Sequence, residues 1–102
     1  MDFLDVPGAS GAHYRFRRVD RDGLPPGGGN LVAVGGAPPH RRLLLCGTAR
    51  SLVRAAPALE AALANPAAAV FVRLNVARAA REAEHADIVA AVRPDADLPE
   101  IG

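Results

Sequence analysis

The stretch over residues 27–54 constrains the fold more than any other part of the chain. It reads GGGNLVAVGGAPPHRRLLLCGTARSLVR. Two short apolar runs, at residues 31–34 and 43–46, flank a loop rich in glycine and proline. This pattern predicts two strands joined as a hairpin, with a loop longer than a tight two-residue turn. Gly47 is expected to end the second strand.

Helices are predicted directly after this hairpin. Thr48 is a suitable N-cap for a helix over residues 49–56. Pro57 would break that helix from within, but it fits the first turn of a second helix over residues 57–64. The stretch therefore predicts a strand, a turn, a strand and then a helical segment.

A third strand and a long helix complete the second half. Residues 69–74, rich in Val and Phe, predict a strand. Asn75 is a natural N-cap for a helix over residues 76–92. One face of that helix carries small side chains, which predicts close packing on the sheet. These residues are Ala79, Ala80, Ala83, Ala86 and Ala90.

The N-terminal part is predicted to contain an arm and one strand. Residues 1–13, broken by proline and glycines, are expected to form a flexible arm. Residues 13–19 alternate aromatic and arginine side chains, which predicts a half-buried strand with its rings in the core. Such alternation also suits nucleic acid, but the half-buried strand is the simpler interpretation. We expect a single α+β domain over residues 14–102, with a mixed or antiparallel sheet of three to four strands flanked by helices.

Charge and cysteine content limit the partners and the location. The net charge is +1, but residues 1–54 carry eight arginines against four aspartates, a net charge of +4. A basic first half is compatible with an anionic partner. Cys46 is the only cysteine, which excludes an intrachain disulfide and favours a reducing compartment. The sequence contains no signal-peptide pattern and no run of membrane-spanning length, so we expect a cytoplasmic protein without a membrane partner.

Several short motifs, in this order, resemble those of one enzyme family. They are GGNLVAV at residues 28–34, LLLCGTARSLVR at residues 43–54, VRLN at residues 72–75 and AAREAEHADIVAAVRP at residues 79–94. Together they resemble the GIY-YIG nuclease superfamily, in particular its small bacterial members, over residues 14–97. The resemblance implies a GIY-YIG-like fold.

The resemblance also indicates where the catalytic groups of that family would lie. Two tyrosines that shape the family's site correspond to Leu31 and Leu45, whereas the glycine of the second motif is retained as Gly47. The family's arginine falls at Ala55. Its metal-binding glutamate falls at His85. Its asparagine near the end falls at Asp97.

These replacements lead to three hypotheses of different kinds. The first is a catalytically inactive module that binds DNA or RNA weakly, or a protein partner, and needs no cofactor. The second is an active Mg²⁺-dependent endonuclease with shifted groups, in which Arg54 serves as the cation and Glu84 with His85 binds the metal. The third is a small structural or regulatory partner protein. Leucine offers no hydrogen bond to water or phosphate, which favours the first hypothesis.

Two further sets of residues remain open as sites. A basic patch that binds phosphodiesters is one interpretation of the arginines near the hairpin, and scattered surface arginine is the other. These residues are Arg41, Arg42, Arg50 and Arg54. His13, His40, His85 and Cys46 match no short zinc-ligand spacing, so we expect unrelated side chains.

Overall fold

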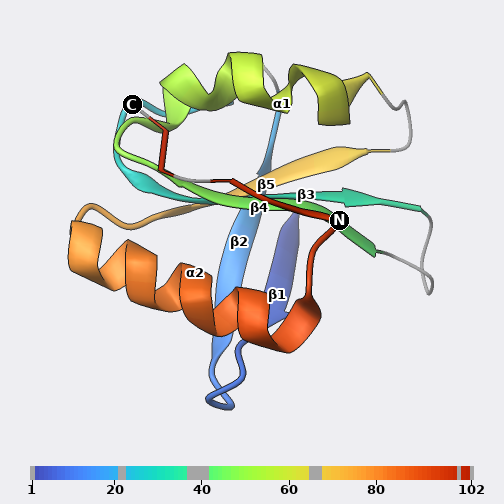
Figure 1. Cartoon of the computed structure of the whole chain (residues 1–102). Coiled ribbons are helices and arrows are strands. Elements are labelled where there is room, and N and C mark those ends of the chain that lie inside the picture. Colours follow the sequence, from blue (N-terminus) through green and yellow to red (C-terminus); the bar gives the residue numbers. More distant parts are fainter. Residues whose placement is uncertain (1, 21–22, 37–41, 65–67, 99, 102) are drawn as a thin grey trace.

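In the part of the chain that it describes, the computed structural model has a sheet of six strands with helices on both faces (Figure 1). It describes residues 2–20, 23–36, 42–64, 68–98 and 100–101. A 3-10 helix, η2 (Leu52–Ala55), leads into α1 (Ala56–Leu63), and α2 (Arg78–Val92) lies on the opposite face. The strands are β1 (Phe3–Pro7), β2 (His13–Val19), β3 (Gly29–Gly35), β4 (Arg42–Ala49), β5 (Ala69–Leu74) and β6 (Ala96–Asp97). The predicted α+β class is confirmed.

The strands lie in the order β1-β2-β5-β3-β4-β6. Neighbours are antiparallel except β4 and β6, which run parallel. The predicted hairpin is confirmed: β3 pairs with β4, and Leu31 lies opposite Gly47. On its other side β3 pairs with β5, so it is the central strand, and all seven of its residues are buried.

Alternation along the strands divides the core into two layers. The layer under η2 and α1 contains Leu31, Ala33 and Leu45 of the hairpin. The layer under α2 contains Val32, Val34, Cys46 and the aromatic rings of Phe16 and Phe71. The rings of β2 thus face the core, as the alternation in residues 13–19 predicts.

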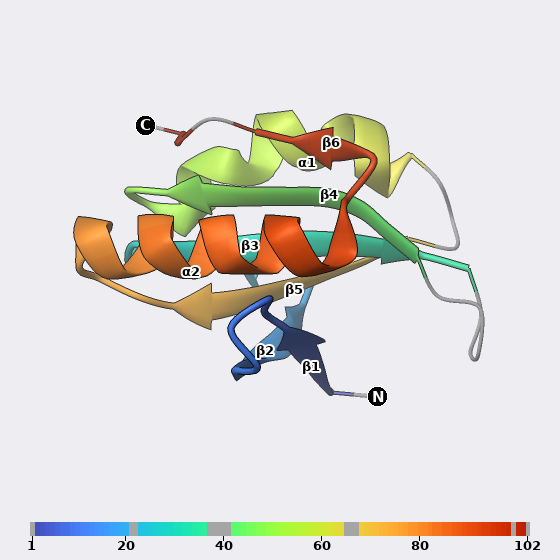
Figure 2. The same ribbon diagram turned by 60° about the horizontal axis from the view of Figure 1, so that its bottom comes forward.

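The prediction of three to four strands is wrong, because β1 and β6 were not expected. β1 lies inside residues 1–13, for which no regular element is predicted. Only Leu4 and Val6 of β1 face the core, which is too short a pattern to detect between proline and glycines. β6 has two residues and pairs with the edge of β4, as Figure 2 shows.

The predicted end of β4 is also wrong. This strand continues through Gly47 to Ala49, and Thr48 is a buried strand residue opposite Asn30 rather than a helix cap. The helical segment begins only at Leu52, as η2. Pro57 does lie in the first turn of α1, as predicted. The strand is longer than predicted because β3 also extends further, from Gly29.

Gly29 shows why the glycine run before β3 is needed. A Cβ atom at this position would collide with the carbonyl oxygen of Arg73 on the neighbouring strand β5. The backbones of β3 and β5 therefore approach each other so closely that only glycine fits. Gly29 is therefore required by the packing of these two strands.

The predicted orientation of α2 is wrong. Ala79, Ala83, Ala86 and Ala90 are exposed, whereas Ile88 and the charged residue Arg81 are buried. The helix begins at Arg78 after Ala77, so Asn75 does not cap it. Neither helix in the described ranges combines the length and apolar character that a membrane-crossing helix needs.

Candidate functional site

The positions that correspond to the family's tyrosines lie in the hydrophobic core. Leu31 is 0% exposed and Leu45 is 7% exposed, and both pack in the layer under η2 and α1. Gly47 lies beside Leu31, and a Cβ at Gly47 would be 3.4 Å from Cβ of Leu98. Nothing at these positions can donate or accept a side-chain hydrogen bond. They cannot activate water.

The arginine position is equally apolar. Ala55 is 0% exposed and packs in the same layer as Leu52 and Leu59. Arg54, the neighbouring residue, is exposed in the last turn of η2. Because η2 covers the face of the sheet opposite α2, Arg54 and the polar residues of α2 are separated by the sheet. The structure does not bring Arg54 together with Glu84 or His85.

Two side chains donate hydrogen bonds to Glu84, one from β5 and one from the residue that follows β5. Arg73 Nε donates to Glu84 Oε1 at 2.8 Å, and Asn75 Nδ2 donates to Glu84 Oε2 at 2.6 Å. The Arg73 guanidinium also lies over the ring of Tyr14, 5.6 Å from its centroid. Both oxygens of Glu84 thus have partners, and its role is to fix α2 on the sheet.

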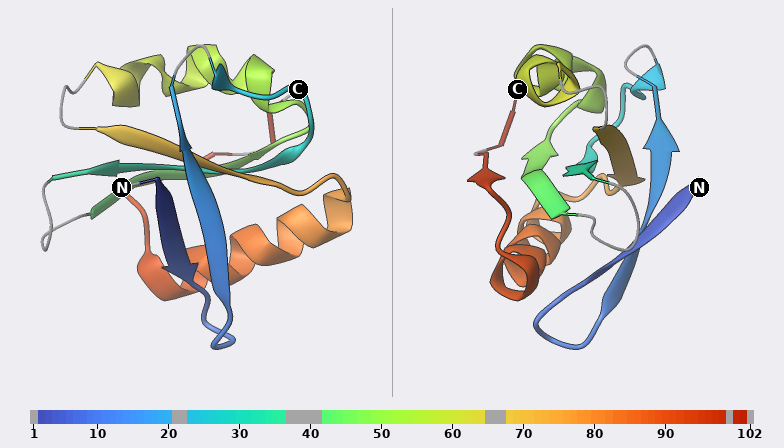
Figure 3. Two further views of the ribbon diagram at one scale, coloured as in Figure 1. Left: turned by 180° about the vertical axis from the view of Figure 1, so that it is seen from behind. Right: turned by 90° about the vertical axis from the view of Figure 1, so that its right-hand side faces the viewer.

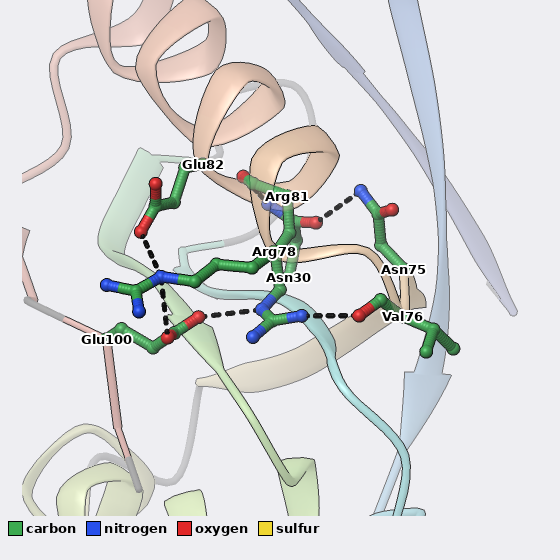
Figure 4. A network of polar contacts seen from close by, with 7 residues as sticks. All are labelled: Asn30, Asn75, Val76, Arg78, Arg81, Glu82 and Glu100. Atoms are coloured by element: carbon green, nitrogen blue, oxygen red, sulfur yellow. Dashed lines mark hydrogen bonds and ion pairs between the residues drawn. The ribbon is translucent and has the colours of Figure 1, made fainter.

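Asn30 continues this chain of hydrogen bonds into the core. Its Oδ1 accepts from Asn75 Nδ2 at 3.1 Å, and its Nδ2 donates to the carbonyl oxygen of Arg81 at 2.9 Å (Figure 4). Asn30 is 2% exposed, so both ends of its amide find partners inside the protein. Hydrogen bonds therefore link polar residues from three of the four motifs that carry the family resemblance.

Arg81 is the most deeply buried charge of this network. Its Nε donates to Glu100 Oε1 at 2.7 Å, and its Nη1 donates to the carbonyl oxygen of Val76 at 2.6 Å. Arg78 lies outside it, with Nε 2.8 Å from Glu82 Oε1 and 3.6 Å from Glu100 Oε2 (Figure 4). The hydrogen bond from Arg81 lowers the pKa of the Glu100 carboxyl. The arginine thus favours the charged form of the Glu100 carboxyl.

His85 and Asp97 do converge. His85 Nε2 lies 2.5 Å from Asp97 Oδ1, across the boundary between α2 and β6. The pair lines a concave pocket with a volume of about 420 Å³ at the edge of the sheet, where β6 runs beside β4 (Figure 2). The other lining residues are Thr48, Glu82, Leu98 and Glu100. This pocket places an imidazole among three carboxylates.

The three other polar lining residues were missed by the sequence analysis. Glu82 lies three residues before His85, so helical spacing would have placed both on one side of α2. Thr48 and Glu100 gave no such signal. Thr48 reaches the pocket from β4 and Glu100 from the C-terminal segment, through pairings that depend on the tertiary structure.

The arginines of the predicted basic patch have different surroundings. Arg50 and Arg54 are exposed. Arg42 is paired with Asp95, with Nη2 2.6 Å from Oδ2, which neutralises its charge. Arg41 lies outside the described residues.

Among the described residues, His13, His85 and Cys46 do not come together as a zinc site. In the described ranges, no group of three His, Cys, Asp or Glu side chains has a geometry that could hold a metal ion. His13 is exposed at the start of β2, whereas Cys46 is buried under α2. Burial raises the pKa of the Cys46 thiol to about 12, and the charge of Asp97 adds to this effect. His40 lies outside the described residues.

Comparison of the chain with models of known protein families, with curated proteins and with solved structures finds no match.

Proposed function

We propose that this protein is a non-catalytic nucleic-acid-binding module built on a scaffold like that of the GIY-YIG nucleases. The observation that carries the proposal is the burial of Leu31, Leu45 and Ala55 in one apolar layer. These are the positions where such a nuclease would need two phenols and a guanidinium. Phosphodiester hydrolysis requires groups that stabilise the charge of the phosphate and activate water, and this layer offers none.

The arrangement of the elements supports the proposal of a scaffold like that of the GIY-YIG nucleases. The strands β3, β4 and β5 form the centre of the sheet, and α2 follows β5, in the order that the resemblance implies. Asn30, Asn75, Arg81 and Glu84 belong to the motifs that carry the resemblance, and their hydrogen bonds have a structural purpose. A scaffold can be kept for such reasons when the chemistry is lost.

Exposed arginines support nucleic acid as the partner. Arg50 and Arg54 are exposed, and so is Val53, at 48%. Two exposed cations suit a phosphate backbone, with modest affinity that falls steeply with salt. The chain would act in the cytoplasm, where the free thiol of Cys46 stays reduced.

Fluorescence anisotropy tests the proposal. Wild-type protein is titrated into labelled single-stranded DNA, duplex DNA and RNA at several salt concentrations, and the Arg50→Ala/Arg54→Ala double variant is compared with Arg93→Ala, an exposed arginine at the end of α2. We expect the double variant to bind more weakly and with a smaller salt dependence, and Arg93→Ala to behave as wild type. Absence of binding by the wild type would refute the proposal.

The pocket at His85 and Asp97 favours one other function. Metal-dependent phosphodiester hydrolysis is the second candidate, with His85, held by Asp97, as the base. Because no three acidic or histidine side chains of the described residues are placed to hold a cation, Mg²⁺ would need the phosphate of the substrate among its ligands. Glu84 and Arg54 have no part in it, because neither lines the pocket. Incubation with plasmid, single-stranded DNA and RNA in Mg²⁺ or Mn²⁺ tests it. Cleavage that is lost in His85→Ala and retained in Arg54→Ala would establish this candidate and overturn the non-catalytic one.

A further inference from the structure

One face of the strands β1 and β2 is not covered by a helix. These strands cross the others steeply (Figure 3). On the side of the sheet that faces α1 elsewhere, they leave a depression of about 300 Å³. It is lined by Phe3, Arg15, Arg17, Val72, Arg73 and Leu74. We refer to Phe3, Arg15, Arg17 and Leu74 as the open-sheet surface.

We propose that the open-sheet surface binds a single strand of nucleic acid, with an unpaired base stacked on Phe3 and the backbone phosphates beside Arg17 and Arg15. The proposal rests on the function proposed above and extends it to a second part of the molecule. None of these residues belongs to the basic patch near the hairpin.

Two exposed apolar side chains supply the contact for bases. Phe3 is 51% exposed and Leu74 is 60% exposed, although both are large and apolar. The guanidinium of Arg15 lies over the ring of Phe3, 5.4 Å from the centroid. A base that stacks on this ring would gain the dispersion and electrostatic contacts typical of single-strand-binding proteins, in which aromatic rings and arginines act together.

The charge of the surface favours a polyanion. Arg15 pairs with Asp5 at 3.0 Å, so its charge is largely neutralised. Arg17 is exposed, and among the described residues no acidic side chain lies within ion-pair distance of it. The surface therefore carries a net positive charge beside its apolar residues. This combination is suited to bases and phosphates rather than to an apolar protein helix.

The loop before β3 lies between Leu74 and η2. Leu74 Cδ2 would lie 3.4 Å from a Cβ at Gly27. The loop around Gly27 is joined to η2 by two backbone hydrogen bonds, from Leu52 N–H to the Gly27 oxygen and from Val53 N–H to the Pro25 oxygen, each 2.9 Å long. The backbone of this loop thus connects the neighbourhood of Leu74 with η2, which carries Arg54.

Single-stranded nucleic acid is favoured over duplex for a chemical reason. Stacking on an exposed ring requires a base whose face is free, and bases inside a duplex have both faces covered. Binding to the phosphates alone would not use Phe3. Replacement of Phe3 should therefore weaken the binding of single strands and leave the binding of duplex unchanged.

The strand β2 provides a matched pair of variants for the test. Arg17 lines the depression, whereas Arg18, the next residue, points to the opposite face and is also exposed. Arg17→Ala and Arg18→Ala remove the same charge from the same strand. Phe3→Leu keeps an apolar side chain but removes the aromatic ring, so it tests stacking rather than hydrophobic contact.

The experiment is anisotropy with a fluorescein-labelled oligothymidylate about 15 nucleotides long, and with a duplex of the same length. We expect Phe3→Leu to weaken single-strand binding at least about fivefold. Arg17→Ala should reduce the slope of log affinity against log salt by about 0.7. Arg18→Ala should change neither the affinity nor the slope. Circular dichroism checks that every variant is folded.

The outcomes that overturn the inference differ from those that overturn the proposed function. If the wild type binds no oligonucleotide, both are refuted. If the wild type binds and Arg50→Ala/Arg54→Ala weakens binding, but Phe3→Leu and Arg17→Ala do not, the open-sheet surface is refuted and the proposed function stands. Duplex binding that equals single-strand binding and is unaffected by Phe3→Leu also refutes the single-strand assignment.

Discussion

Arg81 of α2 and Glu100 of the C-terminal segment form an ion pair in which Nε and Oε1 are 2.7 Å apart. The arginine side chain is 4% exposed and the glutamate side chain 16%. The pair joins the face of α2 to the segment that follows β6, and it explains why a charged residue lies on the buried side of this helix. A buried charge is tolerated when a partner compensates it.

Removal of this arginine should destabilise the protein strongly. Arg81→Ala leaves Glu100 without its closest partner and the carbonyl oxygen of Val76 without its donor. We expect the free energy of unfolding, measured by urea denaturation, to fall by about 3 kcal/mol. The matched control is Arg78→Ala, whose side chain is 65% exposed in its pair with Glu82. The interpretation is wrong if both variants have the same small effect.

Stability should decline in acid partly because of two carboxyl groups. Hydrogen bonds from Arg81 lower the pKa of Glu100, and those from the Ser10 and Tyr14 side chains lower the pKa of Asp87. A carboxyl whose pKa is lower in the folded state stabilises the fold above its unfolded pKa, and this contribution is lost as pH falls through the folded pKa. Unfolding free energy should therefore decrease below about pH 4.5.

The double variant Asp87→Asn/Glu100→Gln tests the origin of this acid sensitivity. Because neither amide titrates, the dependence of unfolding free energy on pH should become flatter in the acid range. Urea denaturation at a series of pH values measures it. An acid slope identical to that of the wild type would show that other groups cause the loss of stability.

Cys46 should be unreactive in the folded protein. Burial raises the pKa of its thiol to about 12, and the side chain lies under α2. The thiolate is the reactive form, so both its scarcity and its burial slow any reaction. We expect Ellman's reagent at pH 8 to label native protein very slowly, and to label protein in concentrated urea at the rate of a free thiol. Rapid labelling without urea would contradict the buried position.

Reintroducing a tyrosine should not restore a nuclease. Leu31 is 0% exposed and is surrounded by the layer under η2 and α1. Leu31→Tyr adds volume and buries a hydroxyl, so we expect it to lower the unfolding free energy by about 1–3 kcal/mol. Leu31→Met, which conserves volume, should cost less than about 1.5 kcal/mol.

Activity provides the second measurement for this variant. Plasmid cleavage in Mg²⁺ should stay absent in Leu31→Tyr and in the double variant Leu31→Tyr/Leu45→Tyr. Metal-dependent cleavage by a stable double variant would contradict this prediction, because it would show that two substitutions restore a catalytic site.

The apolar runs of the sequence predicted the central strands correctly. β3, β4 and β5 were found because each contains an apolar run that is buried on both faces of the sheet, at residues 31–34, 45–46 and 70–72. β1 and β6 were missed because each has too few core-facing residues to form a pattern. The edges of a sheet are defined by their partners more than by their own composition.

The candidate site was harder to predict for a related reason. Helical spacing placed alanines on one side of α2, and small apolar residues normally face a core. The opposite side is buried instead, because Asn30, Asn75 and Glu100 supply partners for its polar groups. The convergence of His85 with Asp97 depends in the same way on β6 lying beside β4.

The sequence by itself determined the class of the fold, the central hairpin and the absence of polar groups at positions 31, 45 and 55. Local composition and periodicity suffice for these features, because an apolar strand is buried whichever segments of the chain pair with it. Only the tertiary structure decided which face of α2 is buried, which carboxylates meet His85, and which part of the sheet stays open around Phe3 and Arg17. Those features depend on contacts between residues far apart in the chain, such as Arg81 with Glu100, whose energies are not encoded in any single segment.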